Sequence, residues 1–289
     1  MKTLLKFLVF IHARLPLSVN RFLGRCYGRF IYYFSARLKH TTEKNLSVCF
    51  PEWDAANLHR LTKESCRHTG MAIAESLWIW GRKPSSVFKK ISVVGQELID
   101  DALSSGAGVI LTGLHMGCWE LITNWSGQYY SSYGFYRSLK KSSLDGVIKR
   151  GRSQTGAHLI AATRSNVKVI IDALKQPNVF IVLADQEPKR GSGVYAPFFG
   201  RPAYTMTLPY QLAKKTGARI LGFDILRTEA GWTLTISDIS HLAHCETKEQ
   251  FAVELNLIFA QIIGKNIAQF EWSYKRFKTP FDGNYDFYQ

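Results

Sequence analysis

The sequence predicts an α/β fold in which helices flank a mostly parallel sheet. Short apolar runs alternate with segments of helical periodicity from residue 91 to residue 226, and this alternation is typical of strands joined by crossover helices. Hydrophobic residues make up 46% of the 289 residues, which is enough for a sizeable core. The sequence has no linker-like segment, low-complexity run or internal repeat. A globular chain is therefore expected.

The first forty residues are predicted to form one or two basic amphipathic helices at a membrane interface. The apolar stretch at 4–17 is interrupted by Lys6, His12 and Arg14 and is shorter than the roughly 20 residues that span a bilayer. It lacks a small-residue cleavage site, so a secretory signal peptide is not expected. Aromatic and basic residues are interleaved over 21–39, as at a membrane surface. Packing of these aromatic residues into a core is the alternative.

The remaining elements follow from hydrophobic periodicity. Residues 53–83 carry apolar residues at spacings of three and four, which predicts a long helix. The predicted elements then run strand 91–95, helix 96–105, strand 107–113, helix 118–128, strand 133–137, helix 143–155, strand 157–160, helix 165–175, strand 178–184, helix 206–216, strand 218–226, strand 232–236 and helix 247–268. The strand at 232–236 is a candidate antiparallel strand. We divide the chain into an N-terminal helical segment, residues 1–40, and one domain, residues 41–289.

His115 and Glu120 follow the predicted strand 107–113. His115 is expected at the junction with the next helix, and Glu120 lies five residues later. The carboxyl ends of parallel strands and the nearby helix N-termini are where α/β folds commonly place chemistry. A carboxylate bonded to one imidazole nitrogen leaves the other nitrogen free to take a proton. The pair is therefore a candidate base with its orienting carboxylate, and a purely structural pair is the alternative.

The cysteines offer a rival site. Cys118 lies three residues after His115 at a possible helix N-terminus, where a thiolate nucleophile would be favoured. The five cysteines are scattered without a C-x-x-C pair, which argues against disulfides or zinc and favours a reducing compartment. His241 and His244 beside Cys245 have a spacing that suits a metal, but no fourth ligand is evident nearby. No metal and no cofactor is expected.

The formal net charge of +15 predicts an acidic partner: nucleic acid, an anionic membrane or an acidic protein. No nucleic-acid recognition motif is present, so nucleic acid is not the expected partner. A dense basic stretch follows the His115 motif and comprises Arg137, Lys140, Lys141, Lys149, Arg150, Arg152 and then Arg164. These cations would repel one another without an anion, although a solvated helix face is the alternative reading of the pattern.

Asp185 and Gln186 follow the predicted strand 178–184. They are therefore expected at the same edge of the sheet as His115. The alternative is that Asp185 caps a loop or pairs with an arginine.

Several short strings in the sequence are ones that occur together in one group of enzymes. They are Asn45-Leu46, Cys49-Phe50-Pro51-Glu52, His115 to Glu120, Tyr136-Arg137, Asp185-Gln186-Glu187-Pro188, Pro197-Phe198-Phe199-Gly200, Ala203-Tyr204-Thr205 and Lys275-Arg276-Phe277. In these strings the chain resembles the bacterial lipid A late acyltransferases of the lauroyl and myristoyl type. They belong to the lysophospholipid acyltransferase superfamily, whose hallmark is His, four residues, then Asp or Glu. The similarity extends from about residue 15 to the C-terminus.

The resemblance implies an αβα architecture and an O-acyltransferase that uses no covalent acyl-enzyme. It implies that His115 is the general base and that Glu120 orients it. It assigns substrate binding to Arg137, Arg152, Arg164, Asp185 and Gln186. It further suggests Phe198 and Phe199 as wall for an acyl chain, or as core, and Thr205 and Thr207 as head-group donors. Relatives commonly carry Asn where this chain has Cys118, which argues against a cysteine nucleophile.

The partners implied by the resemblance are acyl carrier protein as acyl donor, a lipid A precursor as acceptor and an anionic membrane surface. The expected location is the cytoplasmic face of the inner membrane of a Gram-negative bacterium, in lipopolysaccharide biosynthesis. Another glycolipid or a lysophospholipid is the alternative acceptor, and coenzyme A the alternative donor. Two hypotheses from other functional classes remain: a lipid-binding protein without enzymatic activity, and a basic nucleic-acid-binding protein.

Overall fold

The structure is a computed structural model that describes residues 2–137, 142–281 and 287–288. Within these residues a seven-stranded sheet has the order β1-β9-β8-β2-β5-β3-β4, and β6 and β7 form a separate hairpin. The strands are β1 Ile91–Val94, β2 Val109–Gly113, β3 Ser132–Tyr136, β4 His158–Ala161, β5 Val179–Leu183, β6 Gly193–Phe198, β7 Arg201–Met206, β8 Arg219–Arg227 and β9 Trp232–Asp238. All pairings in the large sheet are parallel except that between β8 and β9. The predicted α/β fold class is confirmed.

Strand β2 occupies the middle of the sheet, hydrogen-bonded to β5 on one side and β8 on the other. All five of its residues are buried, as expected for a parallel strand covered on both faces. Val109 and Leu111 contribute to one core cluster, whereas Ile110 contributes to the other. This alternation shows that the apolar run at 109–113 supplies both faces of the sheet.

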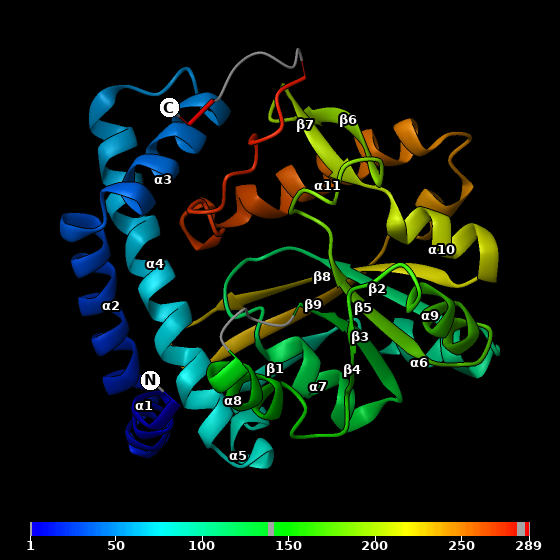
Figure 1. Cartoon of the computed structure of the whole chain (residues 1–289), viewed down its shortest axis with the longest axis horizontal. Coiled ribbons are helices and arrows are strands. Elements are labelled where there is room, and N and C mark those ends of the chain that lie inside the picture. Colours follow the sequence, from blue (N-terminus) through cyan, green and yellow to red (C-terminus); the bar gives the residue numbers. More distant parts are fainter. Residues whose placement is uncertain (1, 138–141, 282–286, 289) are drawn as a thin grey trace.

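Helices cover both faces (Figure 1). Helices α6 and α7 pack on one face, and α9, α10 and α11 pack on the other. Their bounds, with the short α5 and the helix α8, are α5 Pro84–Phe88, α6 Glu97–Ser104, α7 Leu121–Tyr129, α8 Ser142–Arg152, α9 Val167–Leu174, α10 Leu208–Thr216 and α11 Lys248–Lys265, with 3-10 turns at Ser240–His244 and Ile267–Gln269.

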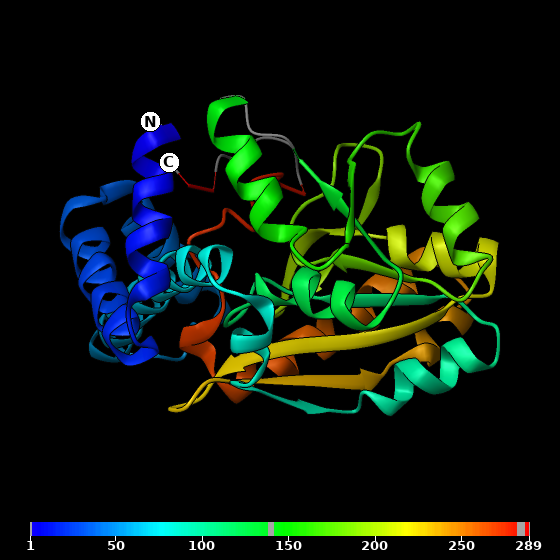
Figure 2. The same ribbon diagram turned by 90° about the horizontal axis from the view of Figure 1, so that it is seen from below.

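The N-terminal helices form a layer at one side of the sheet, seen in blue and cyan in Figures 1 and 2. They are α1 Lys2–Arg14, α2 Leu17–Phe34, α3 Ala36–Cys49 and α4 Ala55–Gly81. Helices α2 and α4 cross at Gly28 and Gly70, where a Cβ on Gly70 would lie 2.2 Å from the backbone nitrogen of Gly28. None of the helices in the described ranges has the length and hydropathy needed to cross a membrane. The division at residue 40 stays a prediction.

Several parts of the fold differ from the prediction, which had no helix corresponding to α3 or α5. The hairpin of β6 and β7 was not expected, because a run with Pro197, Gly200 and Pro202 carries little strand signal. The C-terminal helix ends at Lys265 and is followed by a 3-10 turn. The strand predicted at 232–236 is β9, and it does run antiparallel to β8.

Candidate active site

The register of β2 and β5 brings His115 and Asp185 together. Gly113 at the end of β2 pairs with Leu183 at the end of β5, so the residues two positions further along each chain are neighbours. The Nδ1 atom of His115 lies 2.8 Å from Oδ1 of Asp185, and the His115 backbone N–H donates to Oδ2 at 3.0 Å. The carboxylate therefore fixes both the ring and the backbone of His115.

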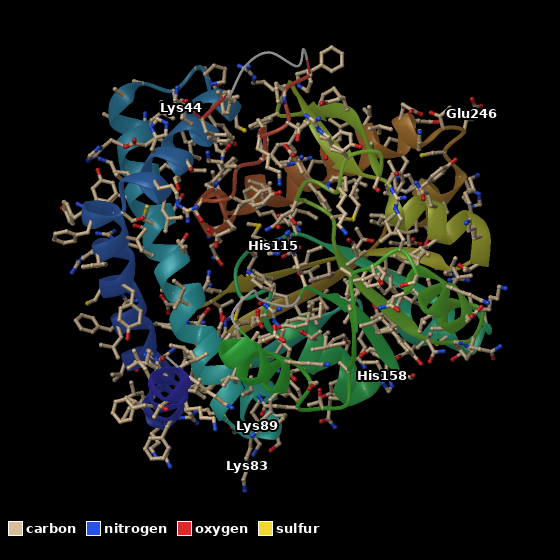
Figure 3. The ribbon with its side chains drawn as sticks, in the orientation of Figure 1. Lys44, Lys83, Lys89, His115, His158 and Glu246 are labelled. Atoms are coloured by element: carbon tan, nitrogen blue, oxygen red, sulfur yellow. The ribbon has the colours of Figure 1, made fainter. Side chains whose placement is uncertain are left out.

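These contacts assign the imidazole tautomer. Asp185 is only 3% exposed, and its carboxylate accepts from an Nδ1–H, so Nε2 carries the lone pair. The side-chain nitrogen of Gln186 lies 3.5 Å from that Nε2, and the edge of the Trp119 ring packs against the imidazole at 4.7 Å between centroids. Figure 3 shows His115 near the middle of the molecule, whereas Lys83, Lys89 and Glu246 lie at its periphery.

Glu120 was expected to orient His115, but in the structure it pairs with Arg152. Its Oε1 accepts from Nε of Arg152 and from the indole N–H of Trp80, and its Oε2 accepts from Nη2 of Arg152 at 2.8 Å. The reason is positional: Glu120 follows a turn and immediately precedes α7, where it meets the last residue of α8, while Asp185 occupies the Nδ1 side of the histidine ring.

The ion pair of Arg152 with Glu120 is enclosed by aromatic rings. The guanidinium lies 5.3 Å from the ring centroid of Trp119 and 5.7 Å from that of Tyr136. Burial lowers the pKa of Arg152, but the charge of Glu120 and its hydrogen bonds together more than offset this, so the pKa is raised and the guanidinium stays charged. Burial also raises the pKa of Tyr136 to about 12, assisted by its hydrogen bond to Asp145. Tyr136 is therefore a neutral donor at physiological pH.

The turn between His115 and Glu120 is fixed by its glycine. Gly117 has a φ of +58°, and a Cβ there would lie 1.8 Å from the backbone oxygen of Ile225. The Gly117 N–H donates to the carbonyl of Gln269 at 2.9 Å, and the Cys118 N–H donates to the carbonyl of Ile225 at 3.0 Å. A side chain at position 117 would displace this loop.

A buried ion network supports the same turn. Arg227 Nη2 donates to the Gly117 carbonyl at 2.6 Å, and Arg227 Nε donates to Oε2 of Glu75 at 2.6 Å. The other oxygen of Glu75 accepts from Arg21 Nε at 2.8 Å. Glu75 is fully buried, so its charge is balanced by two arginines. The network joins α2, α4 and β8 to the loop that carries His115.

A cavity of about 570 Å³ opens beside His115. Its polar lining residues include His115, Arg137, Arg152 and Gln186. Much of the rest of its wall is apolar or aromatic and comprises Trp119, Ile122, Phe135, Tyr136, Leu159, Ala162, Ile181, Val182, Leu183, Met206 and Leu208. This size and composition are typical of a site that binds a ligand with a large apolar part.

The predicted substrate-binding residues fall into three groups. Arg137, Arg152 and Gln186 line the cavity, and Asp185 holds His115 from outside it. Arg164 does not line the cavity: it is exposed in the connection between β4 and α9. Lys140 and Lys141, also part of the predicted basic stretch, lie outside the described residues.

Cys118 is not placed as a nucleophile would be. Its side chain is 2% exposed, and burial, together with the charge of Glu75, raises the pKa of the thiol well above its ordinary value. The metal alternative also finds no support, because the described residues contain no group of three or more His, Cys, Asp or Glu side chains arranged to hold a metal ion.

The residues in and beside the hairpin of β6 and β7 that were predicted to contact the substrate do not line the cavity. Thr205 and Thr207 are buried, and Thr205 bonds to Arg276 and Asn256. Phe198 and Phe199 pack in the core, not in the cavity wall. Instead Met206 and Leu208 supply wall at the end of the hairpin. The sequence shows Met206 and Leu208 as apolar residues on either side of Thr207. Because the hairpin was not predicted, this pattern did not indicate that they line a cavity.

Comparison with known proteins decides the family. A profile described as bacterial lipid A biosynthesis acyltransferase matches residues 2–279. The chain belongs to this family. The palmitoleoyltransferase of lipid A biosynthesis from Escherichia coli (strain K12) is 28% identical over 274 residues, which are 94% of this chain and 89% of that protein. The corresponding lauroyltransferase of the same organism is 26% identical over 274 residues, with the same coverage of both chains.

A partial similarity extends to a second kind of acceptor. A phosphatidylinositol mannoside acyltransferase from Mycobacterium tuberculosis (strain CDC 1551 / Oshkosh) is 28% identical over 142 residues, or 48% of this chain and 45% of that protein. Both kinds of relative are acyltransferases named for lipid products. The resemblance to the lipid A late acyltransferases is thus confirmed over nearly the whole chain.

Proposed function

We propose that this acyltransferase of lipid A biosynthesis moves an acyl chain from an acyl carrier protein thioester to a hydroxyl of a lipid A precursor, with His115 as general base. The observation that carries the proposal is the hydrogen bond from His115 Nδ1 to the buried Asp185, beside a large and mostly apolar cavity. Family membership supports acyl transfer in lipid A biosynthesis.

The geometry supports a direct transfer. Nε2 of His115 accepts the proton of the acceptor hydroxyl as its oxygen attacks the thioester carbonyl carbon. The tetrahedral intermediate then collapses, the carbon–sulfur bond breaks, and the imidazolium returns the proton to the departing thiolate. Asp185 stabilises the imidazolium between the two steps and keeps Nδ1 protonated throughout. The products are an ester and a thiol, so no further reactant is needed.

Glu120 acts in this scheme through Arg152. Two of the guanidinium nitrogens are held by the carboxylate, so the arginine side chain presents a fixed positive charge to the cavity it lines. A fixed cation beside the reacting carbonyl stabilises negative charge on its oxygen as the tetrahedral intermediate forms. The two residues of the motif therefore have different functions: His115 is the base, and Glu120 holds Arg152 in position.

The charge and shape of the cavity support an acyl carrier protein as donor. Arg137 and Lys189 line the cavity that holds His115, and two cations at such a cavity suit an acidic carrier protein. The apolar wall formed by residues such as Ile181, Met206 and Leu208 suits the acyl chain. A coenzyme A thioester is the competing donor, and the two are separated by comparing turnover with matched acyl groups on each carrier.

The exposed faces of α1 and α2 support membrane association, and for a lipid A biosynthesis enzyme we place it at the cytoplasmic face of the inner membrane. Most of the large apolar side chains that are exposed in the described residues lie on these helices: Leu4, Phe7, Phe10, Ile11, Val19, Phe22, Phe30, Tyr33 and Phe34. Arg25 and Arg29 are exposed on the same α2, and this combination binds anionic lipid surfaces. Replacing Phe7 and Phe22 by Ser should weaken binding to anionic vesicles, whereas Val169→Ser should not.

The experiment that tests the proposed function is mass spectrometry of lipid A from a host that lacks its late acyltransferases. Complementation with this chain should add the mass of one acyl group, and the His115→Ala variant, expressed to the same level, should add none. An unchanged lipid A mass with well-expressed wild-type protein would contradict the proposal. In that case the similarity to a phosphatidylinositol mannoside acyltransferase makes another glycolipid the acceptor to test next.

A further inference from the structure

A second cavity, of about 400 Å³, meets the first at Gln186. Its lining residues are Arg37, Gln186, Glu271, Ser273, Tyr274 and Lys275. Gln186 lines both cavities, and its side-chain nitrogen is 3.5 Å from Nε2 of His115. Gln186 therefore lies between the two cavities, of which the proposed function uses only the one that His115 lines.

Two cations, Arg37 and Lys275, line the second cavity together with one carboxylate, Glu271. Arg37 and Lys275 form no ion pair within the described ranges, whereas Arg152 in the first cavity is paired with Glu120. The Nζ atom of Lys275 lies 5.0 Å from the ring centroid of Tyr288. Two such cations in one cavity favour an anionic ligand, and an arginine suits a phosphate in particular.

The remaining lining groups suit hydroxyl groups. The carboxylate of Glu271 accepts from the hydroxyl groups of Thr69 and Ser273, so it is already a hydrogen-bonding centre for hydroxyls. Gln186 adds an amide, and Tyr274 adds an aromatic side chain. A carboxylate, an amide and an aromatic ring together with two cations match a phosphorylated sugar better than a bare anion.

The position of the cavity suits a ligand that is anchored in lipid. Arg37 lies in the first turn of α3, and the exposed Tyr33 and Phe34 end the preceding helix α2. Glu271 is tied to the catalytic loop, because its backbone N–H donates to the carbonyl of His115 at 2.9 Å. The cavity thus connects the apolar N-terminal face with the loop of the base.

We propose that this second cavity binds the phosphorylated sugar head group of the lipid acceptor, while the first cavity takes the acyl chain of the donor. The inference rests on the proposed function. A hydroxyl on an acyl chain close to its link with the sugar would then reach His115 with the head group held by Arg37 and Lys275. Recognition of the phosphate would make these two residues determinants of acceptor specificity.

The experiment compares two acceptors in neutral detergent micelles without phospholipid. One is the phosphorylated lipid A precursor, and the other is the same lipid with its phosphates removed. The test variant is Arg37→Gln with Lys275→Gln, and the control is Arg219→Gln with Lys248→Gln, which makes the same change in net charge at exposed sites away from the cavity. Each protein is assayed for KM and kcat at saturating donor, and its melting temperature is recorded.

For the test variant we expect KM for the phosphorylated acceptor to rise by about tenfold or more, with kcat and the KM for the dephosphorylated acceptor within about twofold. The control should resemble wild type. An unchanged KM, or an equal rise for both acceptors, would overturn the inference. One further result would also overturn it. Wild type would show no preference for the phosphorylated acceptor, and added anionic phospholipid would inhibit wild type but not the test variant. The cavity would then bind the phosphate of bulk lipid and not that of the acceptor.

Failure of the proposed function gives a different result. Wild-type protein would then form no product with either acceptor. The binding part is measured separately with the His115→Ala variant, which lacks the base but keeps the cavity. Tighter binding of the phosphorylated than of the dephosphorylated lipid by this variant supports the head-group site, and equal binding of the two lipids overturns it.

Discussion

The pair of His115 with Asp185 and the pair of Glu120 with Arg152 lie beside the same cavity but differ in the partner of each carboxylate. Asp185 holds a group that can gain and lose a proton. Glu120 holds a guanidinium whose pKa is raised and which stays charged. In the proposed mechanism the first pair takes up and releases a proton, whereas the second keeps a constant charge.

The difference shows how a motif of two residues can serve two functions. His115 and Glu120 are close in sequence, but the turn at Gly117 separates their partners. His115, the proposed base, is held by a carboxylate from the segment that follows the neighbouring strand β5, not by one from its own loop. Spacing along the sequence thus pointed to the loop, and pairing between strands decides which carboxylate contacts His115.

The largest expected effect is that of Asp185→Asn. The amide still accepts from the His115 backbone N–H, but it favours the wrong tautomer of the ring, so kcat should fall by about 10²- to 10⁴-fold. KM for the acceptor should change little. Rates measured with purified protein, corrected for the folded fraction by thermal melting, check this. A kcat within threefold of wild type would remove Asp185 from the mechanism.

Glu120→Gln should act mainly on stability. It leaves the largely buried charge of Arg152 without its carboxylate, at a cost of about 3 kcal/mol in the free energy of unfolding. Replacing both residues by Met should recover part of this loss, because no unpaired charge remains. Urea unfolding measures both variants. If Glu120→Gln unfolds like wild type and yet loses as much kcat as Asp185→Asn, the two pairs do not differ as described.

His68 lies beside the two arginines that pair with the buried Glu75, and it should make the stability of the protein depend on pH. Burial, with the charges of Arg227 and Arg21, lowers the pKa of the nearby His68 to about 3, whereas an unfolded histidine titrates near 6.5. As pH falls below about 6.5 the unfolded state takes up the proton first, so stability is lost from there down to pH 3. Between pH 7 and pH 5, His68→Gln should lose about 1 to 2 kcal/mol less stability than wild type. Urea unfolding of both proteins at the two pH values measures this. An equal loss of unfolding free energy in wild type and variant would contradict the prediction.

Cys118→Ala should have the smallest effect. Since burial keeps this residue a thiol, kcat should stay within about twofold, and stability should fall by about 1 kcal/mol through the lost packing. The native protein should also resist alkylation at Cys118, as mass spectrometry of the labelled protein would show. Inactivation of the alanine variant to the level of Asp185→Asn would restore the cysteine as a candidate nucleophile.

Much of the sheet could be predicted because its strands are continuous apolar runs. The predicted strands 107–113 and 178–184 correspond to β2 and β5, and the expectation that Asp185 and His115 share one edge of the sheet holds. The order of the strands was not predictable. Nothing in the sequence indicates that β5 pairs with β2, and without this order the carboxylate nearest in sequence was the natural choice.

The arginines show the same limit. Arg152 and Arg164 are equally basic and follow the same motif, but only Arg152 lines the cavity, because α8 ends beside Glu120 while Arg164 lies beyond β4. Likewise, the hairpin that supplies Met206 has a weak strand pattern. Residues that are placed by tertiary contacts between distant segments could not be ranked from composition and spacing.

Nitrogen–proton NMR of protein labelled at histidine shows whether Asp185 or Glu120 holds the ring of His115, with His115→Ala used to assign the His115 imidazole signal. The account predicts a hydrogen-bonded Nδ1–H resonance of His115 that is lost or strongly shifted in Asp185→Asn and is unchanged in Glu120→Gln. The reverse outcome, with the resonance kept in Asp185→Asn and lost in folded Glu120→Gln, would show that Glu120 orients the base and would contradict the account.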